Sequence, residues 1–499
     1  MATGHGANPS LYQLNTRVHL TARSRALGRP ATLDDITDAE LDRVAGLGFD
    51  WVWLLSVWRT GEASRAVSLA LPDLRRSLVA ALPDLTDADI GGSGFAISAY
   101  EVSAALGGDA ALARLRSRMA ARGLRLMLDF VPNHTSLDHP WVSTHPERFV
   151  RGSAADLRAA PSNWTSVIGP GGASIVLAHG RDPFFPGWTD TLQLDYGNVD
   201  TVAAMTAELA SIAARCDGVR CDMAMLLLPD VFERTWGHAA RPFWSDAIAR
   251  AREANPAFTL LAEVYWDLEG TMLGLGFDLA YDKTLYDRLV AGPAGPVRDH
   301  LRAPLGEQAH LARFLENHDE PRAAAVFPFD RHEAAALVTF LAPGLRFLHE
   351  GELEGCRVRV PPQLVRGPAE PVDRRLARFY GALLGLLRDR LVRDGAWRLL
   401  DVTPAWDGNP THDGFVAFAW RDGERRLVVA VNLGSTQGQG FVRAPLDDLR
   451  GARVRLVDRL SGQVFERDAD DLAARGLYVD LPAFGHHVLE ATARPGSSA

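Results

Sequence analysis

The chain of 499 residues contains 53 basic and 62 acidic residues, carries a formal net charge of −9, and is 47% hydrophobic. This composition is typical of a globular protein with a large core, and the length predicts two or three domains. A general nucleic-acid binder is excluded, because the charge is negative and no basic cluster is present.

The N-terminal ten residues lack the basic start and apolar stretch of a signal peptide. No apolar run reaches the roughly 20 residues that a membrane helix needs. The cysteines Cys216, Cys221 and Cys356 cannot build a disulfide framework and are not spaced as metal ligands. We therefore expect a cytoplasmic protein with reduced thiols and with neither a membrane nor a nucleic acid as partner. The sequence does not indicate an oligomeric state.

Short apolar runs alternate with amphipathic stretches over the first 390 residues. The expected strands are 12–20, 49–57, 124–131, 218–222, 258–264, 277–281, 310–315 and 345–349. Continuous apolar runs are typical of parallel strands buried on both faces. The expected helices are 35–47, 109–122, 201–215, 241–254, 283–302, 331–341 and 372–390, with Asp34 and Asp109 as N-cap candidates.

Eight strands alternating with helices predict a (β/α)8 TIM barrel over residues 11–392. An open doubly wound sheet is the alternative, but no glycine-rich phosphate loop follows the first strand. Two connections are long, 58–108 and 135–200, and residues 136–200 are expected to form an inserted domain. From residue 393 to 492, short strands between turn residues predict a C-terminal antiparallel β domain, a β-sandwich.

Polar residues stand at the ends of several predicted strands. They are Asp129, Asn133 and His134 after the third strand, Arg220 and Asp222 in the fourth, Glu263 in the fifth, and Asn317, His318 and Asp319 after the seventh. The carboxyl ends of barrel strands meet at one face, where barrel enzymes build their sites. A charge at the end of an apolar strand is costly unless it is paired or functional. We therefore expect these side chains to converge on one site.

The strand spacing indicates a reaction type. Neighbouring strands lie about 4.8 Å apart, so Asp222 and Glu263 can approach the roughly 5–5.5 Å separation of a retaining glycosidase. Asp222 is then the nucleophile, and Glu263 the acid and base, its pKa raised by apolar neighbours. Arg220 points to the same side as Asp222 and would keep it ionised. Asp319 is a third carboxylate that would stabilise the transition state.

Four segments together resemble glycoside hydrolase family 13, the α-amylase superfamily. They are DFVPNH (129–134), GVRCD (218–222), AEVYW (262–266) and ENHDEPR (316–322). The resemblance implies that His134 and His318 bind hydroxyls of the sugar at the cleavage point, and that 136–200 is the B domain of the family. It also places Phe95 where an aromatic ring stacks on that sugar. Asp129, Asn133 and Tyr265 complete the predicted substrate-binding set.

The expected function is hydrolysis or transglycosylation of α-glucosidic bonds in oligosaccharides or disaccharides through a glycosyl-enzyme. The alternative is a non-catalytic sugar-binding or assembly relative, although such relatives commonly lose part of the carboxylate trio. No cofactor is required. Calcium stays open, because Asn133 matches a ligand position of relatives, while MAMLL (223–227) replaces the Lys-His pair that serves a calcium site and an acceptor subsite.

Overall fold

The computed structural model describes residues 7–494. Residues 1–6, which are part of the stretch judged to lack a signal peptide, lie outside the described residues. Within the described range, no helix has the length and apolar character needed to span a membrane.

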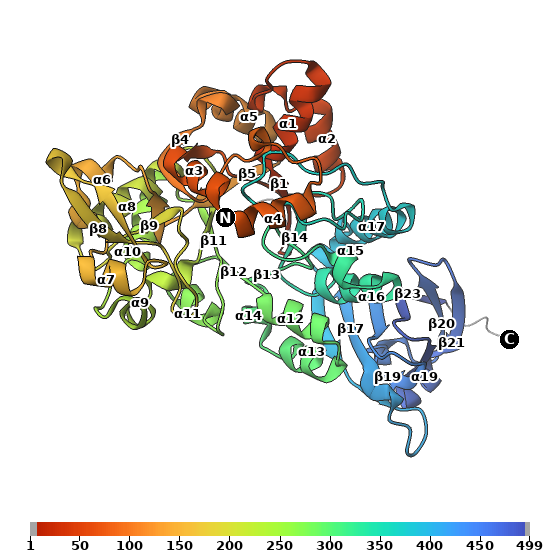
Figure 1. Cartoon of the computed structure of the whole chain (residues 1–499). Helices are drawn as coiled ribbons and strands as arrows, with labels where there is room; N and C mark the ends of the chain where they lie inside the picture. The colour runs from red at the N-terminus through yellow and green to blue at the C-terminus, as the bar shows by residue number, and fades with distance from the viewer. Residues whose placement is uncertain (1–6, 495–499) are drawn as a thin grey trace. The chain divides into compact units, whose positions relative to one another are not determined.

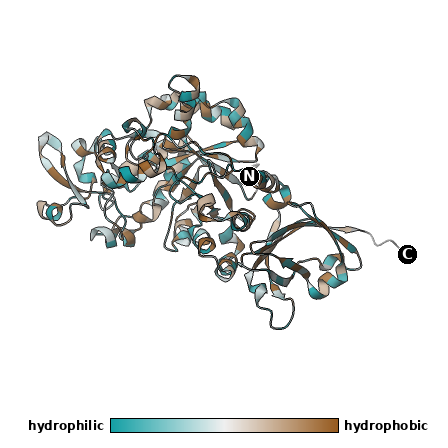
Figure 2. Ribbon diagram, turned by 45° about the vertical axis from the view of Figure 1, so that its right-hand side comes forward, coloured by the Kyte–Doolittle hydropathy of each residue, from teal (hydrophilic) through white to brown (hydrophobic). Residues whose placement is uncertain are grey.

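Within residues 7–494, eight strands close into a barrel in which the strands follow one another in chain order (Figure 1). They are β1 (Ser10–Asn15), β2 (Trp51–Leu55), β5 (Arg125–Phe130), β10 (Gly218–Cys221), β11 (Thr259–Ala262), β12 (Leu279–Tyr281), β13 (Leu311–Arg313) and β14 (Leu345–His349). Neighbours such as β5, β10 and β11 pair in parallel. The predicted TIM barrel is therefore confirmed, and its strands are mostly brown, that is hydrophobic, in Figure 2.

Helices alternate with these strands and bury one face each. In α5, for example, the buried residues Ala111, Leu112, Leu115 and Met119 recur at helical spacing. The long helices are α1 (Thr16–Leu27), α2 (Asp38–Gly46), α5 (Gly108–Ala120), α8 (Val199–Ala213), α10 (Trp244–Ala254), α12 (Lys283–Ala291), α13 (Ala294–Leu301), α16 (Phe329–Phe340) and α17 (Arg374–Leu387). The remaining helices in this part are η1 (Leu33–Asp35), η3 (Ala104–Leu106), η6 (Ala224–Leu227), α9 (Pro229–Trp236), α11 (Glu269–Gly274), α14 (Leu305–Gln308), α15 (Ala323–Val326) and α18 (Arg390–Arg393).

Some predicted boundaries were wrong. The strand predicted at 12–20 ends at Asn15, because the Asn15 side chain accepts a hydrogen bond from Val18 N and begins α1. The single helix predicted at 283–302 is two helices, since Gly292 has a φ of 108° and is followed by Pro293.

The predicted N-caps were also wrong. Thr37 caps α2 in a capping box with Glu40, and Gly107 precedes α5. Asp34 lies inside η1, and Asp109 lies in the first turn of α5, where it accepts a hydrogen bond from Val102 N.

Two excursions follow barrel strands, as the long connections predicted. The first, after β2, contains β3 (Trp58–Thr60), α3 (Glu62–Ala70), α4 (Pro72–Ala81), η2 (Asp87–Asp89) and β4 (Ile97–Val102). The second, after β5, is the inserted B domain. It contains β6 (His134–Ser136), α6 (Trp141–Thr144), η4 (Pro146–Arg148), α7 (Ala154–Ala159), β7 (Trp164–Ile168), η5 (Pro170–Gly172), β8 (Ser174–Ala178) and β9 (Thr191–Gln193).

The C-terminal part is antiparallel β structure, as predicted. One sheet has the order β15-β17-β18-β23-β20-β21, and a second has the order β16-β19-β22. Both sheets contribute to one core, for example through Val428 of the first and Val479 of the second. The elements are β15 (Ala396–Leu400), β16 (Val402–Pro404), η7 (Thr411–Gly414), β17 (Phe415–Asp422), β18 (Arg425–Asn432), β19 (Gly438–Val442), η8 (Asp447–Leu449), β20 (Arg453–Asp458), β21 (Val464–Asp468), α19 (Ala469–Arg475), β22 (Leu477–Leu481) and β23 (His486–Arg494).

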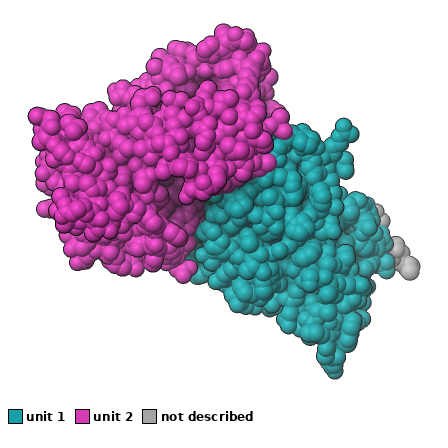
Figure 3. Space-filling view, viewed as in Figure 1, with its two compact units in different colours: residues 1–11, 282–357, 370–499 teal, residues 12–281, 358–369 magenta. Residues whose placement is uncertain are grey.

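By compactness the chain divides into two units, coloured separately in Figure 3. Unit 2 comprises Tyr12–Tyr281 together with Val358–Ala369, and unit 1 comprises the remainder. Most of the predicted site residues belong to unit 2, whereas His318 and Asp319 belong to unit 1. The predicted domain boundaries follow the strand pattern instead, and they stay a prediction.

Candidate active site

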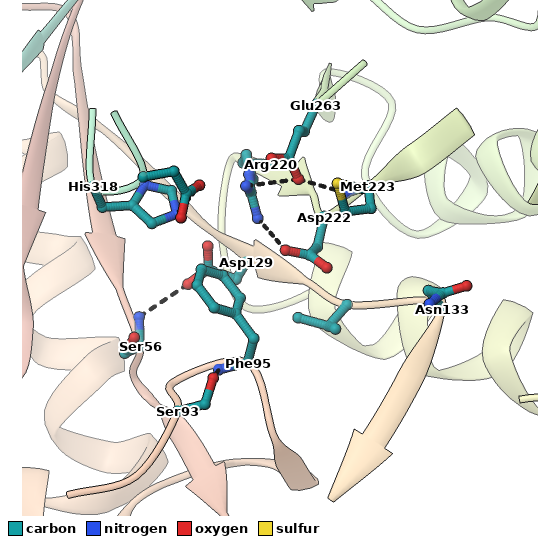
Figure 4. A network of polar contacts seen from close by, with 12 residues as sticks. Ser56, Ser93, Phe95, Asp129, Asn133, Arg220, Asp222, Met223, Glu263 and His318 are labelled. Carbon is teal, nitrogen blue, oxygen red and sulfur yellow. Dashed lines mark hydrogen bonds and ion pairs between the residues drawn. The ribbon is translucent and has the colours of Figure 1, made fainter. Parts of the chain in front are cut away.

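One arginine joins the two acidic residues that end neighbouring strands. β10 pairs with β11 so that Cys221 stands opposite Ala262, and Asp222 and Glu263 follow directly. Arg220 Nη1 lies 2.6 Å from Asp222 Oδ1, and Arg220 Nη2 lies 2.7 Å from Glu263 Oε2 (Figure 4). The side chains of Asp222, Glu263 and Arg220 are 8%, 4% and 1% exposed. Adjacent nitrogens of a single guanidinium thus hold the two carboxylates as close neighbours.

Aromatic rings surround this guanidinium. Arg220 Cζ lies 5.5 Å from the ring centroid of Trp53, 5.2 Å from that of Phe95 and 5.8 Å from that of Tyr281. The Tyr281 hydroxyl also accepts a hydrogen bond from Arg220 Nε at 3.4 Å. A cation that aromatic faces shield from water interacts more strongly with its carboxylates. The rings therefore fix the position of Arg220.

Glu263 accepts two further hydrogen bonds. The Met223 backbone N–H donates to Oε2 at 2.6 Å, and the Tyr265 hydroxyl donates to Oε1 at 2.7 Å. Met223 follows Asp222 directly and has a φ of 42°, a conformation that non-glycine residues rarely adopt. This backbone turn after β10 links Glu263 to the residue next to Asp222. The structure thus places the Tyr265 hydroxyl on the predicted acid and base.

Asp129 accepts hydrogen bonds from residues in β2 and directly after it. Its Oδ1 accepts from Trp53 Nε1 at 3.0 Å and its Oδ2 from the Ser56 backbone N–H at 2.9 Å, while its carbonyl accepts from Trp58 Nε1 at 2.7 Å. Asp129 is 1% exposed. Ser56 has a φ of 65°, so the carboxylate stabilises a strained turn at the end of β2. These bonds give Asp129 a positioning role that its sequence motif did not specify.

Asn133 and His134 lead into the B domain. Asn133 Oδ1 accepts from Gln193 Nε2 at 3.0 Å, and Asn133 Nδ2 lies 3.4 Å from His134 Nδ1. The His134 ring centroid is 5.2 Å from that of Trp188. Burial lowers the pKa of His134 to about 3, so the imidazole is neutral near pH 7. A neutral imidazole can offer one donor and one acceptor to a polar ligand.

Two observations bear on calcium binding at Asn133, which the sequence left open. Calcium takes six to eight oxygen ligands, usually with several carboxylates. The Asn133 oxygen is engaged by Gln193 Nε2, and residues 7–494 contain no group of three or more His, Cys, Asp or Glu side chains placed to hold a metal.

His318 and Asp319 follow β13 in unit 1. Asn317 Oδ1 accepts from the backbone N–H groups of Asp319 and Glu320, both at 2.9 Å, which folds the segment into a tight turn. His318 Nε2 lies 3.0 Å from Asp319 Oδ2, with side chains 1% and 40% exposed. This turn presents the Asp319 carboxylate to solvent and buries the neighbouring histidine.

Some residues of the site were not found from the sequence. Trp53 and Tyr281 surround Arg220, and the Met223 N–H binds Glu263. Tyr281 is the last residue of β12, so the strand-end rule that selected Asp222 would have selected it too. No sequence signal reveals the Met223 contact, because it depends on a backbone turn.

Comparisons with known proteins point to alpha-amylases and related enzymes. A model of the alpha-amylase catalytic domain matches residues 22–169. The alpha-amylase MalA of Haloarcula japonica is 25% identical over 457 residues, which are 88% of this chain and 59% of that protein. The trehalose synthase of Thermus thermophilus is 30% identical over 237 residues, 40% of this chain and 23% of that protein. The matched part of the chain thus spans 59% of the length of the first relative and 23% of the length of the second.

Among solved structures, an alpha-amylase from Lactobacillus plantarum has the same fold, with a TM-score of 0.68 and 20% identity over 97% of this chain and 99% of that one. The barrel, the domain inserted after β5 and the C-terminal β domain are the features shared with this fold. Residues 22–169 are thus similar to the alpha-amylase catalytic domain, and the chain as a whole has the fold of solved alpha-amylases.

Proposed function

We propose that the chain is a retaining glycosidase or transglycosidase that acts on α-glucosidic bonds of oligosaccharides or disaccharides. The bridging of Asp222 and Glu263 by a single guanidinium carries this proposal. A retaining enzyme holds its two carboxyl groups about 5–5.5 Å apart, whereas an inverting enzyme needs about 6.5–9.5 Å to admit a water between them. Carboxylates that share one guanidinium suit the narrower separation.

In the proposed reaction, Asp222 attacks the anomeric carbon while Glu263 protonates the leaving oxygen. Arg220 keeps Asp222 ionised and aligned for attack. Glu263 then removes a proton from water or from a sugar hydroxyl, which displaces Asp222 and restores the anomeric configuration. Asp319 stabilises the positive charge that develops on the sugar ring.

The remaining predicted residues would bind the sugar at the cleavage point. The Phe95 ring is partly exposed and offers an apolar face for stacking. His134 and His318 would bind hydroxyl groups, with Asn133 next to the His134 ring. No metal takes part in the proposed reaction. The cytoplasmic location stays a prediction from the sequence.

The experiment that tests this function uses maltose, maltooligosaccharides, isomaltose, trehalose and sucrose as substrates, with products resolved by chromatography and by anomeric NMR. We expect the first product to retain the α configuration. Asp222→Asn should lose at least about 10³-fold in kcat while unfolding at the wild-type temperature. A fluorinated glucosyl fluoride should add one glycosyl unit to the wild-type protein and none to Asp222→Asn. Product of inverted configuration, or full activity in Asp222→Asn, would refute the mechanism.

The same assay distinguishes this function from the alternative of a non-catalytic relative. A non-catalytic sugar-binding protein would bind one of these sugars and leave all of them unconverted. The presence of the carboxylates together with their bridging arginine favours catalysis, because a binding module has no need to keep two buried acids paired in this way.

A further inference from the structure

A salt bridge ties the segment after β14 to the first excursion. Arg366 Nε and Nη2 donate to Asp89 Oδ1 and Oδ2 at 2.6 and 2.8 Å, and Arg366 Nη1 donates to Asp84 Oδ1 and Oδ2 at 2.9 and 3.0 Å. Arg366 is 8% exposed. We call Arg366, Asp84 and Asp89 the Arg366 clamp. All three residues belong to unit 2.

Apolar and backbone contacts reinforce the Arg366 clamp. Leu364 is 0% exposed and packs into a small core of its own with Leu78, Ala81, Leu82 and Ile90. Backbone hydrogen bonds run from Gly91 N to Gln363 O and from Val365 N to Asp89 O, both at 2.9 Å. The segment Val358–Ala369 therefore shares a core and backbone hydrogen bonds with the first excursion.

Four residues, Gly91 to Gly94, join the part of the chain held by the Arg366 clamp to Phe95. We call these four residues the connector. A Cβ on Gly91 would lie 2.4 Å from Val365 Cγ1, one on Gly92 would lie 2.9 Å from Arg65 Cα, and one on Gly94 would lie 1.8 Å from Ser56 Oγ. Real Cβ atoms do not approach so closely, so the neighbouring residues leave no room for a side chain at these three glycines. Arg17 Nη2 also donates to Gly92 O at 2.9 Å.

The connector delivers Phe95 to the site. The Phe95 ring centroid lies 5.2 Å from Arg220 Cζ, and the Phe95 N–H donates to Ser93 Oγ at 3.2 Å. Figure 4 shows Phe95 and Ser93 below the group formed by Arg220, Asp222 and Glu263. A displacement of the connector would therefore move the Phe95 ring away from Arg220.

We propose that Arg366 is a positioning residue: by binding Asp84 and Asp89 it fixes the connector, and through the connector it holds Phe95 beside Arg220. This inference rests on the proposed function. Loss of Phe95 removes a stacking face for the sugar, which weakens substrate binding and raises KM. A purely structural role of Arg366 would instead lower the fraction of folded enzyme, which reduces the apparent kcat at constant KM.

A double-mutant cycle separates these two roles. Arg366→Gln, Phe95→Ala and the double variant are compared with the wild type on the best disaccharide substrate. Arg114→Gln is the matched control, because Arg114 makes two hydrogen bonds to Asp34 on the exposed surface. We expect KM to be about tenfold above wild type in each single variant, and also only about tenfold above wild type in the double variant. The control should keep the wild-type KM.

Additive effects, which would bring the KM of the double variant to about a hundredfold above wild type, would overturn the proposal. A lower kcat at wild-type KM in Arg366→Gln would also overturn it. Should Arg366→Gln fail to fold, Asp84→Asn replaces it in the same cycle, since the Asp84 side chain is 76% exposed. If the wild type is inactive on every substrate, the proposed function fails. If the wild type and the control are active and the cycle is additive, only the role of Arg366 fails.

Discussion

Replacing Arg220 by lysine tests whether the bridging guanidinium organises the site. An ammonium group is a single point of charge and cannot occupy two carboxylates in the fixed geometry of a guanidinium. Hydrogen bonds to charged groups contribute about 1.5–3 kcal/mol each, and a buried charge that loses its partner costs about 3–5 kcal/mol. If about 3–4 kcal/mol of this is lost in the transition state, kcat/KM falls about 10²–10³-fold.

The measurement is kcat/KM for the best disaccharide, together with the folded fraction from circular dichroism. Arg114→Lys is the control, because Arg114 also bonds both oxygens of one carboxylate but lies at the surface. We expect the control to match the wild type. A folded Arg220→Lys protein with kcat/KM within about threefold of wild type would show that the bridge seen in the structure is not needed for catalysis.

Two further predictions concern protonation and metals. His134 is neutral in the folded protein, with a pKa of about 3, whereas a histidine in the unfolded chain takes up a proton below about pH 6.5. The contribution of His134 to the free energy of unfolding is therefore complete above pH 6.5 and is lost as the pH falls toward 3. In urea unfolding, His134→Gln should lose about 2 kcal/mol less than wild type between pH 7 and pH 5, and equal losses would contradict the burial argument. Because Asn133 Oδ1 is bound by Gln193, EDTA should change neither kcat nor the melting temperature, and a melting temperature that falls with EDTA and returns with calcium would show a site that this arrangement does not provide.

The barrel was predictable from the sequence because each of its strands is a short apolar run that can be recognised from a few neighbouring residues. The pairing of Arg220 with Asp222 was also predictable, since side chains two apart on a strand point the same way. Boundaries were harder, because a helix can begin directly after a strand. At Asn15 the change from strand to helix depends on a side-chain cap, which leaves the hydrophobic pattern unchanged.

Contacts between distant segments were beyond sequence reasoning. Asp282 ends β12 much as Asp222 ends β10, yet its carboxylate is paired with Arg313 at 3.0 Å and with His300 at 2.8 Å. The strand-end rule alone cannot tell such a structural acid from a catalytic one. The partner of Asp89 is equally hidden, because Arg366 lies 277 positions further along the chain.

That separation has a consequence for synthesis on the ribosome. Translation proceeds at about 5–20 residues per second, so Asp84 and Asp89 wait on the order of 15–55 s before Arg366 emerges. During this interval Leu78, Leu82 and Ile90, all nearly inaccessible to solvent in the finished protein, lack the leucine that completes their core. The nascent chain therefore exposes these apolar side chains for most of its elongation, and we expect a chaperone to bind the segment that carries them.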